Sequence, residues 1–164
     1  MKKNIICYLN GVSSSGKTSI CSFLVDYFSE PTIYLSLDNF HKVLCKKYST
    51  EKWPLYKEEV KGLHRTAKVW YDMGFNVIID NVLETSSLKQ DAKRKLPSAK
   101  YIGVHLSLKT LLEREKKRGR NDFKLVKYQF ERVHKDMDYD FSVDSEKSSS
   151  EELAKRIYEE INND

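Results

Sequence analysis

The feature that most constrains this chain is the octapeptide at residues 11–18, which reads Gly-Val-Ser-Ser-Ser-Gly-Lys-Thr. It matches the pattern G-x-x-x-x-G-K-[ST] of a phosphate-binding P-loop at every fixed position. The apolar run before it, residues 5–9, has the length and β-branched content of a buried strand. After it, apolar side chains recur at helical spacing, at Ile20, Phe23, Leu24, Tyr27 and Phe28. A strand, a glycine-bearing loop and a helix in this order are the context that a P-loop needs.

The residue types of this loop suit a bound triphosphate. Glycine at positions 11 and 16 lets the backbone approach a phosphate closely, and the N–H groups that follow face an anion at the positive end of the helix. We expect the Lys17 ammonium to reach the β- and γ-phosphates and the Thr18 hydroxyl to bind Mg²⁺. An ordinary strand-to-helix turn with a solvated lysine does not account for the flanking elements. The predicted nucleotide-binding residues of the loop are therefore Gly11, Ser13, Ser14, Ser15, Gly16, Lys17 and Thr18.

The composition is that of one domain spanning residues 1–164. At 164 residues and 40% hydrophobic content, the chain is long enough to bury a sizeable core. The apolar run after its basic start is too short for a signal peptide, and no apolar run reaches membrane-spanning length. The three cysteines, Cys7, Cys21 and Cys45, form no C-x-x-C pair. We expect a cytoplasmic protein with no membrane partner.

Charge is unevenly spread along the chain. The formal net charge of +5 comprises 16 basic and 10 acidic residues in 1–108, 10 and 4 in 109–135, and 3 and 10 in 136–164. A basic middle followed by an acidic tail indicates an anionic ligand for the middle. Nucleic acid would satisfy this pattern, and so would ATP.

Beyond the P-loop, strands and helices alternate without a linker or a repeat. Short apolar runs predict strands at residues 33–37, 77–79, 101–106 and 139–143. Residues 39–56 are expected to be irregular. Helices are expected over 57–73, from Thr85 or Ser86 to before Pro97, over 108–118, from about 122, and after the capping box Ser149-x-x-Glu152. This order predicts an α/β fold with a parallel sheet covered by helices on both faces.

Two aspartates follow predicted strands, Asp38 after residues 33–37 and Asp80 after residues 77–79. The carboxyl ends of parallel strands meet at one edge of a sheet, where ligands bind, so we expect both aspartates to lie beside the P-loop. Asp80 resembles a Walker-B aspartate and would hold Mg²⁺ together with Thr18. Asp38 is the better candidate for a general base that accepts a proton from an acceptor hydroxyl. The two roles could also be exchanged.

Three arginines, Arg114, Arg118 and Arg120, bracket Gly119 at a break between two predicted helices. A flap over about residues 114–124 could close on a triphosphate and neutralise the charge that develops during transfer. We assign Arg118 and Arg120 to the transfer step, together with Lys17, and Arg114 and Arg118 to nucleotide binding. The alternative is a solvated basic helix end, where the helix dipole favours cations in any case.

Residues 9–18, the strand ending in Asp38 and residues 77–82 resemble the chloramphenicol phosphotransferase-like P-loop kinases. The segments 114–122 and 139–144, with His134 between them, extend the resemblance over most of the chain. Shikimate and nucleoside monophosphate kinases are the wider relatives. The resemblance implies a three-layer fold with a five-stranded parallel sheet in the order 2-3-1-4-5, ATP and Mg²⁺ as cofactors, and Asp38 as the catalytic base.

The chain departs from this family at two places. Asn81 stands where the family commonly has a second acidic residue after the strand-three aspartate. The expected acceptor-binding region, about residues 39–68, holds eight basic and three acidic residues. This balance fits a polar or anionic acceptor better than chloramphenicol itself.

The sequence favours an ATP-dependent small-molecule O-phosphotransferase, resembling chloramphenicol 3-O-phosphotransferase. A kinase of nucleosides, nucleotides or nucleic-acid ends is one alternative, although the chain shows no separate module of the kinds that read bases. A nucleotide-binding protein without transfer activity is another, and the presence of Asp38 and the arginine flap argues against it. The sequence predicts neither the acceptor's identity nor the oligomeric state.

Overall fold

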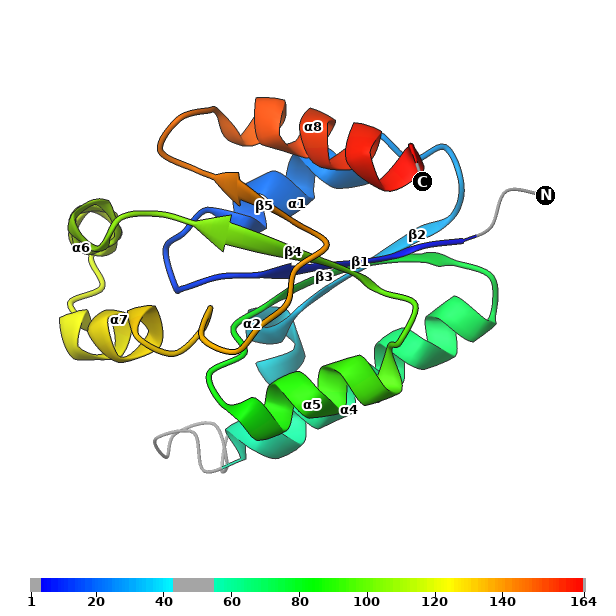
Figure 1. The fold of residues 1–164 in the computed structure, drawn as a ribbon, viewed down its shortest axis with the longest axis horizontal. Coiled ribbons are helices and arrows are strands. Elements are labelled where there is room, and N and C mark those ends of the chain that lie inside the picture. Colours follow the sequence, from blue (N-terminus) through cyan, green and yellow to red (C-terminus); the bar gives the residue numbers. More distant parts are fainter. Residues whose placement is uncertain (1–3, 43–54, 164) are drawn as a thin grey trace.

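The computed structural model describes residues 4–42 and 55–163, so residues 43–54 of the expected acceptor region, Cys45 among them, lie outside the described part. A parallel sheet forms the middle layer of the molecule (Figure 1). Its strand order is β2-β3-β1-β4-β5, which confirms the predicted order. The strands are β1 (Ile6–Asn10), β2 (Thr32–Ser36), β3 (Asn76–Asn81), β4 (Lys100–His105) and β5 (Phe141–Asp144).

Helices cover both faces of the sheet, as predicted. Figure 1 shows α1 (Lys17–Val25) and α8 (Ser150–Asn162) on one face, and α4 (Tyr56–Asp72) and α5 (Ser86–Lys95) on the other. The helices α6 (Leu108–Lys117) and α7 (Phe123–Phe130) lie beyond the carboxyl end of β4, and the short α2 (Leu37–His41) follows β2. The three-layer P-loop kinase architecture is therefore present.

Alternation along β1 divides the core into two halves, because successive strand side chains point to opposite faces. Ile6 and Tyr8 pack with the core against α4 and α5. Cys7 and Leu9 pack with the core against α1 and α8. All four side chains have an exposed fraction of 0%. The central strand that leads into the P-loop is thus fixed from both sides.

Several local predictions were wrong, and residues 39–41, which were expected to be irregular, belong to α2. Residue 37 does not continue β2, because the Ser36 hydroxyl accepts a hydrogen bond from the Asn39 N–H and caps α2, whose first turn contains Asp38. Phe23 is 40% exposed, because the buried side of α1 is formed by Ile20, Cys21 and Leu24. The fifth strand begins at Phe141 rather than at residue 139.

Other termini follow the sequence signals. Thr85, rather than Ser86, caps α5 by accepting a hydrogen bond from the Leu88 N–H. The capping box of Ser149 and Glu152 is present at the start of α8. Gly74 follows α4 with a φ of +93°, a conformation that favours glycine at a helix end. Within the described residues, no helix is both long enough and apolar enough to cross a bilayer.

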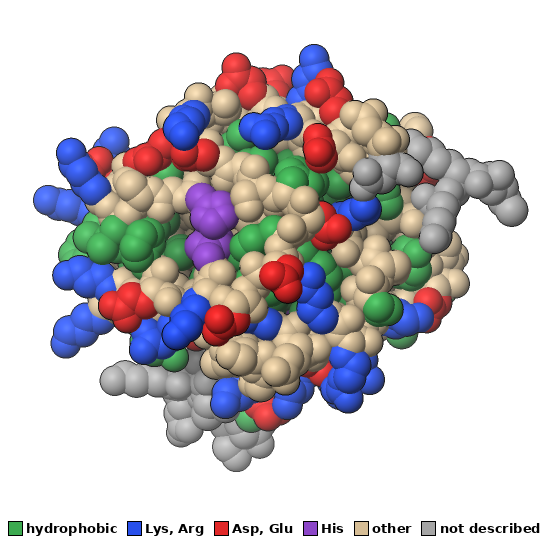
Figure 2. Space-filling view, in the orientation of Figure 1, with side chains coloured by type: hydrophobic (Ala, Val, Ile, Leu, Met, Phe, Trp, Pro, Cys, Tyr) green, Lys and Arg blue, Asp and Glu red, His purple; other side chains and the backbone are tan. Residues whose placement is uncertain are grey.

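Acidic and basic side chains are interspersed on the face shown in Figure 2, without a continuous basic stripe. On this face, folding therefore partly intersperses acidic and basic residues that are segregated along the sequence. A long basic track is what a nucleic-acid backbone would require.

A buried chain of hydrogen bonds joins β3, β1, α4 and α5. The Asn81 amide donates to the Tyr8 hydroxyl over 2.7 Å, and the Val82 N–H donates to Asn81 Oδ1, which fixes the orientation of the amide. The Tyr8 hydroxyl then donates to His64 Nε2 over 2.8 Å, and His64 Nδ1 donates to Asp91 over 2.9 Å. Burial lowers the pKa of His64, and the opposing effect of Asp91 is smaller. His64 is therefore neutral and accepts at Nε2.

Because His64 is buried and neutral in this hydrogen-bond network, the stability of the folded state depends on pH. An unfolded histidine has a pKa of about 6.5, so as pH falls through that value the unfolded chain takes up a proton that buried His64 does not, and the folded state loses stability. We expect the free energy of unfolding, measured by urea denaturation between pH 7.5 and 5, to depend less steeply on pH in His64→Gln.

The pKa of His134 is lowered to about 4 mainly by burial, so this histidine also makes the folded state less stable as pH falls. In His64→Gln the slope of the free energy of unfolding against pH should therefore shrink without vanishing. His134→Gln is therefore the matched comparison. An unchanged slope in His64→Gln would show that this histidine does not contribute.

Candidate active site

A cavity of about 410 Å³ lies at the carboxyl ends of the strands beside the P-loop. Its wall is formed by the P-loop, the end of β2 with the start of α2, the start of α4, the end of β3 with the residues after it, α6 with the α6–α7 connection, and α7. The predicted site residues that line it are Ser13, Ser14, Lys17, Thr18, Asp38, Asp80, Arg118 and Arg120. The structure thus brings most of the predicted residues to one cleft.

Two P-loop glycines occupy positions where a side chain would be strained. A Cβ at Gly11 would lie 2.7 Å from the Val104 carbonyl oxygen of β4 and 2.8 Å from Ser15 Oγ. Gly16 has a φ of +99° and stands directly before α1. Ser15 Oγ is buried and has no hydrogen-bond partner among the described residues. A buried hydroxyl without a partner in a loop of this shape fits a phosphate oxygen as its missing acceptor.

Lys17 lies beneath the loop with an exposed fraction of 6%. Its ammonium donates to the carbonyl oxygens of Gly11 (2.9 Å) and Val12 (3.0 Å) and lies 3.9 Å from Asp80 Oδ1. Burial lowers the pKa of Lys17, and Asp80 opposes this effect, as does the weaker field of Asp38. The Lys17 ammonium is therefore held against the backbone at the start of the P-loop.

Thr18 and Asp80 form the contact that a hard cation would use. The Thr18 hydroxyl donates to Asp80 Oδ2 over 2.7 Å, and the Tyr34 hydroxyl donates to the same oxygen over 3.2 Å. No group of three His, Cys, Asp or Glu side chains in the described residues could hold a metal by itself. Mg²⁺ is usually held by one or two carboxylates, water and substrate phosphates, so a single carboxylate beside a hydroxyl fits it.

Asp38 reaches the cleft from the first turn of α2 and is exposed there. β3 lies between β2 and β1, and Ser36 of β2 is paired with Asp80 of β3. Asp38 therefore enters the cleft from the β2 side of Asp80, whereas the P-loop follows β1 on the other side. Asp80 is largely buried in β3, and Asp38 is open to a ligand. The exposed carboxylate is the one suited to meet an acceptor, and the buried one is suited to support a metal.

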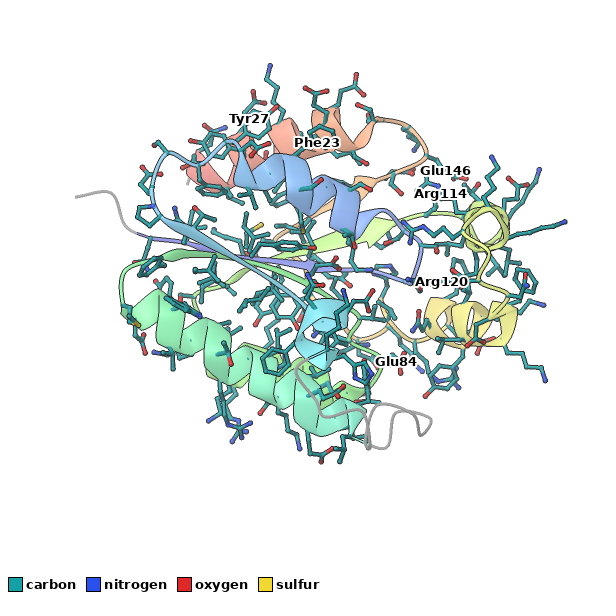
Figure 3. The ribbon with its side chains drawn as sticks, turned by 180° about the vertical axis from the view of Figure 1, so that it is seen from behind. Phe23, Tyr27, Glu84, Arg114, Arg120 and Glu146 are labelled. Atoms are coloured by element: carbon teal, nitrogen blue, oxygen red, sulfur yellow. The ribbon has the colours of Figure 1, made fainter. Side chains whose placement is uncertain are left out.

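The three arginines divide between two places, and Figure 3 labels two of them, Arg114 and Arg120. Arg118 and Arg120 line the cleft, and Arg118 Nη1 lies 3.5 Å from Ser14 Oγ. Arg114 donates to the Ser145 carbonyl oxygen over 2.9 Å, and its guanidinium lies 3.5 Å from the Cβ position of Gly16. Arg114 therefore stands next to the P-loop backbone, outside the group of residues that line the cavity.

Several residues that hold the loop were absent from the sequence-based set. Gln129 Oε1 accepts from the Ser13 N–H over 2.9 Å, and Gln129 Nε2 donates to Glu84 over 2.7 Å. Buried Glu115 accepts from the Ser14 hydroxyl over 2.6 Å.

A signal for two of these residues exists in the sequence. Glu115 lies four residues after Leu111, and Gln129 lies three residues after Val126, so each is a polar residue on the apolar side of its helix. A polar residue in such a position usually has a buried partner. The partner itself cannot be read from the helix.

Comparison with known proteins gives a consistent result. The sequence profile of the family described as chloramphenicol phosphotransferase-like protein matches residues 4–162. An inferred O-phosphotransferase of Mycobacterium tuberculosis strain H37Rv is 25% identical over 186 residues, covering 97% of this chain and 83% of that protein.

Two solved structures share the fold. The APS kinase of Mycobacterium tuberculosis, in complex with AMPPNP and APS, has a TM-score of 0.78 at 13% identity and covers 99% of each chain. A gluconokinase of Sinorhizobium meliloti has a TM-score of 0.74 at 17% identity and covers 99% of this chain and 94% of its own. At these identities the likeness concerns the backbone arrangement alone.

The close approach at Gly11 predicts a selective effect of substitution. Gly11→Ala places a methyl group against β4 and should cost about 1–3 kcal/mol of stability by overpacking. Gly74→Ala is the matched control, because its φ is +93° but nothing lies within 4 Å of the new Cβ; it should cost about 1–2 kcal/mol from backbone strain alone.

Urea denaturation and ADP titration of both variants would check this. We expect ADP affinity to fall only in Gly11→Ala, because only that substitution displaces the loop. Equal losses of affinity in both variants would contradict the role of the close approach.

Proposed function

The chain belongs to the chloramphenicol phosphotransferase-like protein family and is a phosphotransferase with the P-loop kinase fold, and we propose that it transfers the γ-phosphoryl group of ATP to a hydroxyl of a small molecule. The observation that carries this proposal is the meeting of three features in one cleft. These are the P-loop with Lys17, the Thr18–Asp80 contact, and the exposed carboxylate of Asp38.

The P-loop would bind the triphosphate through its N–H groups, the Ser15 hydroxyl and the Lys17 ammonium. Thr18 and Asp80 would hold Mg²⁺, which supplies neutralisation of phosphate charge when it is bound. Tyr34 keeps Asp80 oriented by donating to the same carboxylate oxygen. These residues position the donor and do not need to exchange protons with it.

Asp38 would orient the acceptor hydroxyl and take its proton. As the O–H bond breaks, the acceptor oxygen bonds to the γ-phosphorus and the bond from that phosphorus to the β–γ bridging oxygen breaks. The products are ADP, the phosphate monoester and the proton that Asp38 has accepted. Arg118 and Arg120, which line the same cleft, would neutralise the charge that moves onto the transferred group.

The acceptor is proposed to be a small molecule because the cleft has a volume of about 410 Å³, which is in the range of small-molecule sites. The inferred activity of the Mycobacterium tuberculosis relative, an O-phosphotransferase, agrees with a hydroxyl acceptor. We propose that residues 1–164 act as one domain, with α2 and the start of α4 on the acceptor side and residues 114–124 as the flap. Because Cys7 and Cys21 are buried free thiols, we propose the cytoplasm as the compartment.

The separate roles of Asp38 and Asp80 can be tested with a pair of isosteric variants. Asp38→Asn removes the base and keeps its shape, so turnover should fall about a hundredfold to ten-thousandfold. ATP·Mg²⁺ affinity should barely change in this variant, because no hydrogen bond or ion pair among the described residues joins Asp38 to Thr18 or Lys17. In Asp80→Asn the affinity itself should fall. Calorimetric titration beside a turnover assay would measure both.

A loss of nucleotide affinity in Asp38→Asn that is absent from Asp80→Asn would exchange the two assignments. A protein in which no acceptor raises ATP consumption above background would not be a kinase of this kind.

The cleft arginines should act on transfer more than on binding. Arg118→Ala and Arg120→Ala are each expected to lower kcat by about a hundredfold, the typical cost of removing one preorganised donor, with a smaller change in ADP affinity. Arg156→Ala, an exposed substitution on α8, is the control and should leave both quantities unchanged. Equal losses of kcat and ADP affinity would make these arginines simple phosphate clamps.

A further inference from the structure

Glu84 is the carboxylate of the cleft whose role is not explained by phosphate binding. It lies between β3 and α5 and lines the cavity together with Asp38. Figure 3 shows it on the side of α2 and α5, whereas Arg114 and Arg120 lie on the side of α6. Glu84 therefore belongs to the part of the cleft that faces the acceptor.

No cation is paired with the carboxylate of Glu84 among the described residues. Gln129 Nε2 donates to Glu84 Oε1 over 2.7 Å, and among the described residues Glu84 makes no ion pair. Its second carboxylate oxygen has no hydrogen bond within this part of the chain. Burial raises the pKa of Glu84, and the Gln129 amide and the more distant Arg132 oppose this effect. A half-buried carboxylate with one neutral partner gains from a ligand that donates or carries positive charge.

Gln129 fixes the distance between this carboxylate and the phosphate site. The side chain of Gln129 is 3% exposed, and its two ends join the Ser13 N–H of the P-loop to Glu84. The free oxygen of Glu84 is thus held at a set position relative to the loop that would bind the γ-phosphate. A group bound there would be located relative to the reacting hydroxyl.

The basic residues between 39 and 68 do not counter this charge where the structure describes them. Lys57 and Arg65 are exposed on α4, and neither lines the cavity. Lys68 pairs with Asp72 on the same helix, and Lys42 donates to Asn39. The positive net charge of this region in the sequence is therefore carried, in its described part, by side chains outside the cleft. Lys46, Lys47 and Lys52 lie outside the described residues.

We propose that Glu84 is a specificity residue that binds a protonated amine of the acceptor, so that the substrates are amine-bearing alcohols. This inference rests on the proposed phosphotransfer to a hydroxyl. In this arrangement the Glu84 carboxylate binds the ammonium, Asp38 receives the hydroxyl, and Gln129 keeps the spacing between Glu84 and the P-loop. Acceptors that carry a carboxylate in place of the amine are repelled.

A panel of amine-bearing alcohols tests the inference when each member is paired with its N-acetylated and its carboxylate counterpart. Ethanolamine, N-acetylethanolamine and 3-hydroxypropanoate form one such set, in which only the group at the end opposite the hydroxyl changes. Binding is measured by calorimetry with a non-hydrolysable ATP analogue and Mg²⁺ present, and turnover is measured separately with ATP. We expect amine members to bind about tenfold or more tightly than their counterparts, as one charge-assisted hydrogen bond provides.

Glu84→Gln separates recognition from structure, because glutamine can still accept from Gln129 Nε2 while the charge is gone. This variant should lose the preference for the amine. Glu160→Gln, an exposed substitution on α8, is the matched control and should keep it. The preference should also weaken as pH falls through the pKa of Glu84, which burial raises, because protonation removes the charge. An unchanged preference in Glu84→Gln would overturn the inference.

Two further outcomes would also overturn it: counterparts that bind as tightly as the amines, or amine members that all fail to bind. Turnover of alcohols with no preference for an amine would also overturn the inference, but it would leave the proposed transfer to a hydroxyl intact. An amine preference in binding that Glu84→Gln abolishes, with no turnover of any member, would support recognition of the amine by Glu84 and count against the proposed transfer to these alcohols.

Discussion

The hydrogen bond between Thr18 and Asp80 is the contact on which the rest of the site depends. It exists because β3 lies beside β1 with Asp80 opposite Leu9, so the residue that follows the P-loop lysine meets the carboxylate of the neighbouring strand. β2 then adds Tyr34 to the same oxygen and leads into Asp38 on the outer side. A sheet with another strand order would separate these groups, whatever their spacing in the sequence.

Much of the fold could be predicted because its signals are local. The P-loop, the capping box at Ser149 and the glycine stop at Gly74 each act within a few residues, and all three occur in the structure. Strand order followed from the family resemblance, since alternating strands and helices alone do not determine which strands become neighbours. The predicted cleft residues were brought together by that order.

The parts that could not be predicted depend on distant partners. Ser36 ended its strand by capping a helix, which apolar patterning of residues 33–37 could not show. Gln129 meets Ser13 across 116 residues and Glu84 across 45. Helical periodicity shows that a polar residue faces inward, but its partner is fixed only when two segments pack. On the proposed acceptor side, the contact between Gln129 and Glu84 is of this kind.

This difference follows from what each half of the cleft must bind. Residues 11–18 would form the proposed phosphate site mainly through backbone groups, glycines and one lysine, so one short segment contains most of its chemistry. The proposed acceptor side takes Asp38, Glu84 and Gln129 from three separate segments, and Asp38 can change without removing a hydrogen bond of the P-loop backbone. A kinase fold can therefore keep its donor site and exchange its acceptor. In this chain Gln129 touches both halves, so a change of acceptor that alters Glu84 must still satisfy the Ser13 N–H.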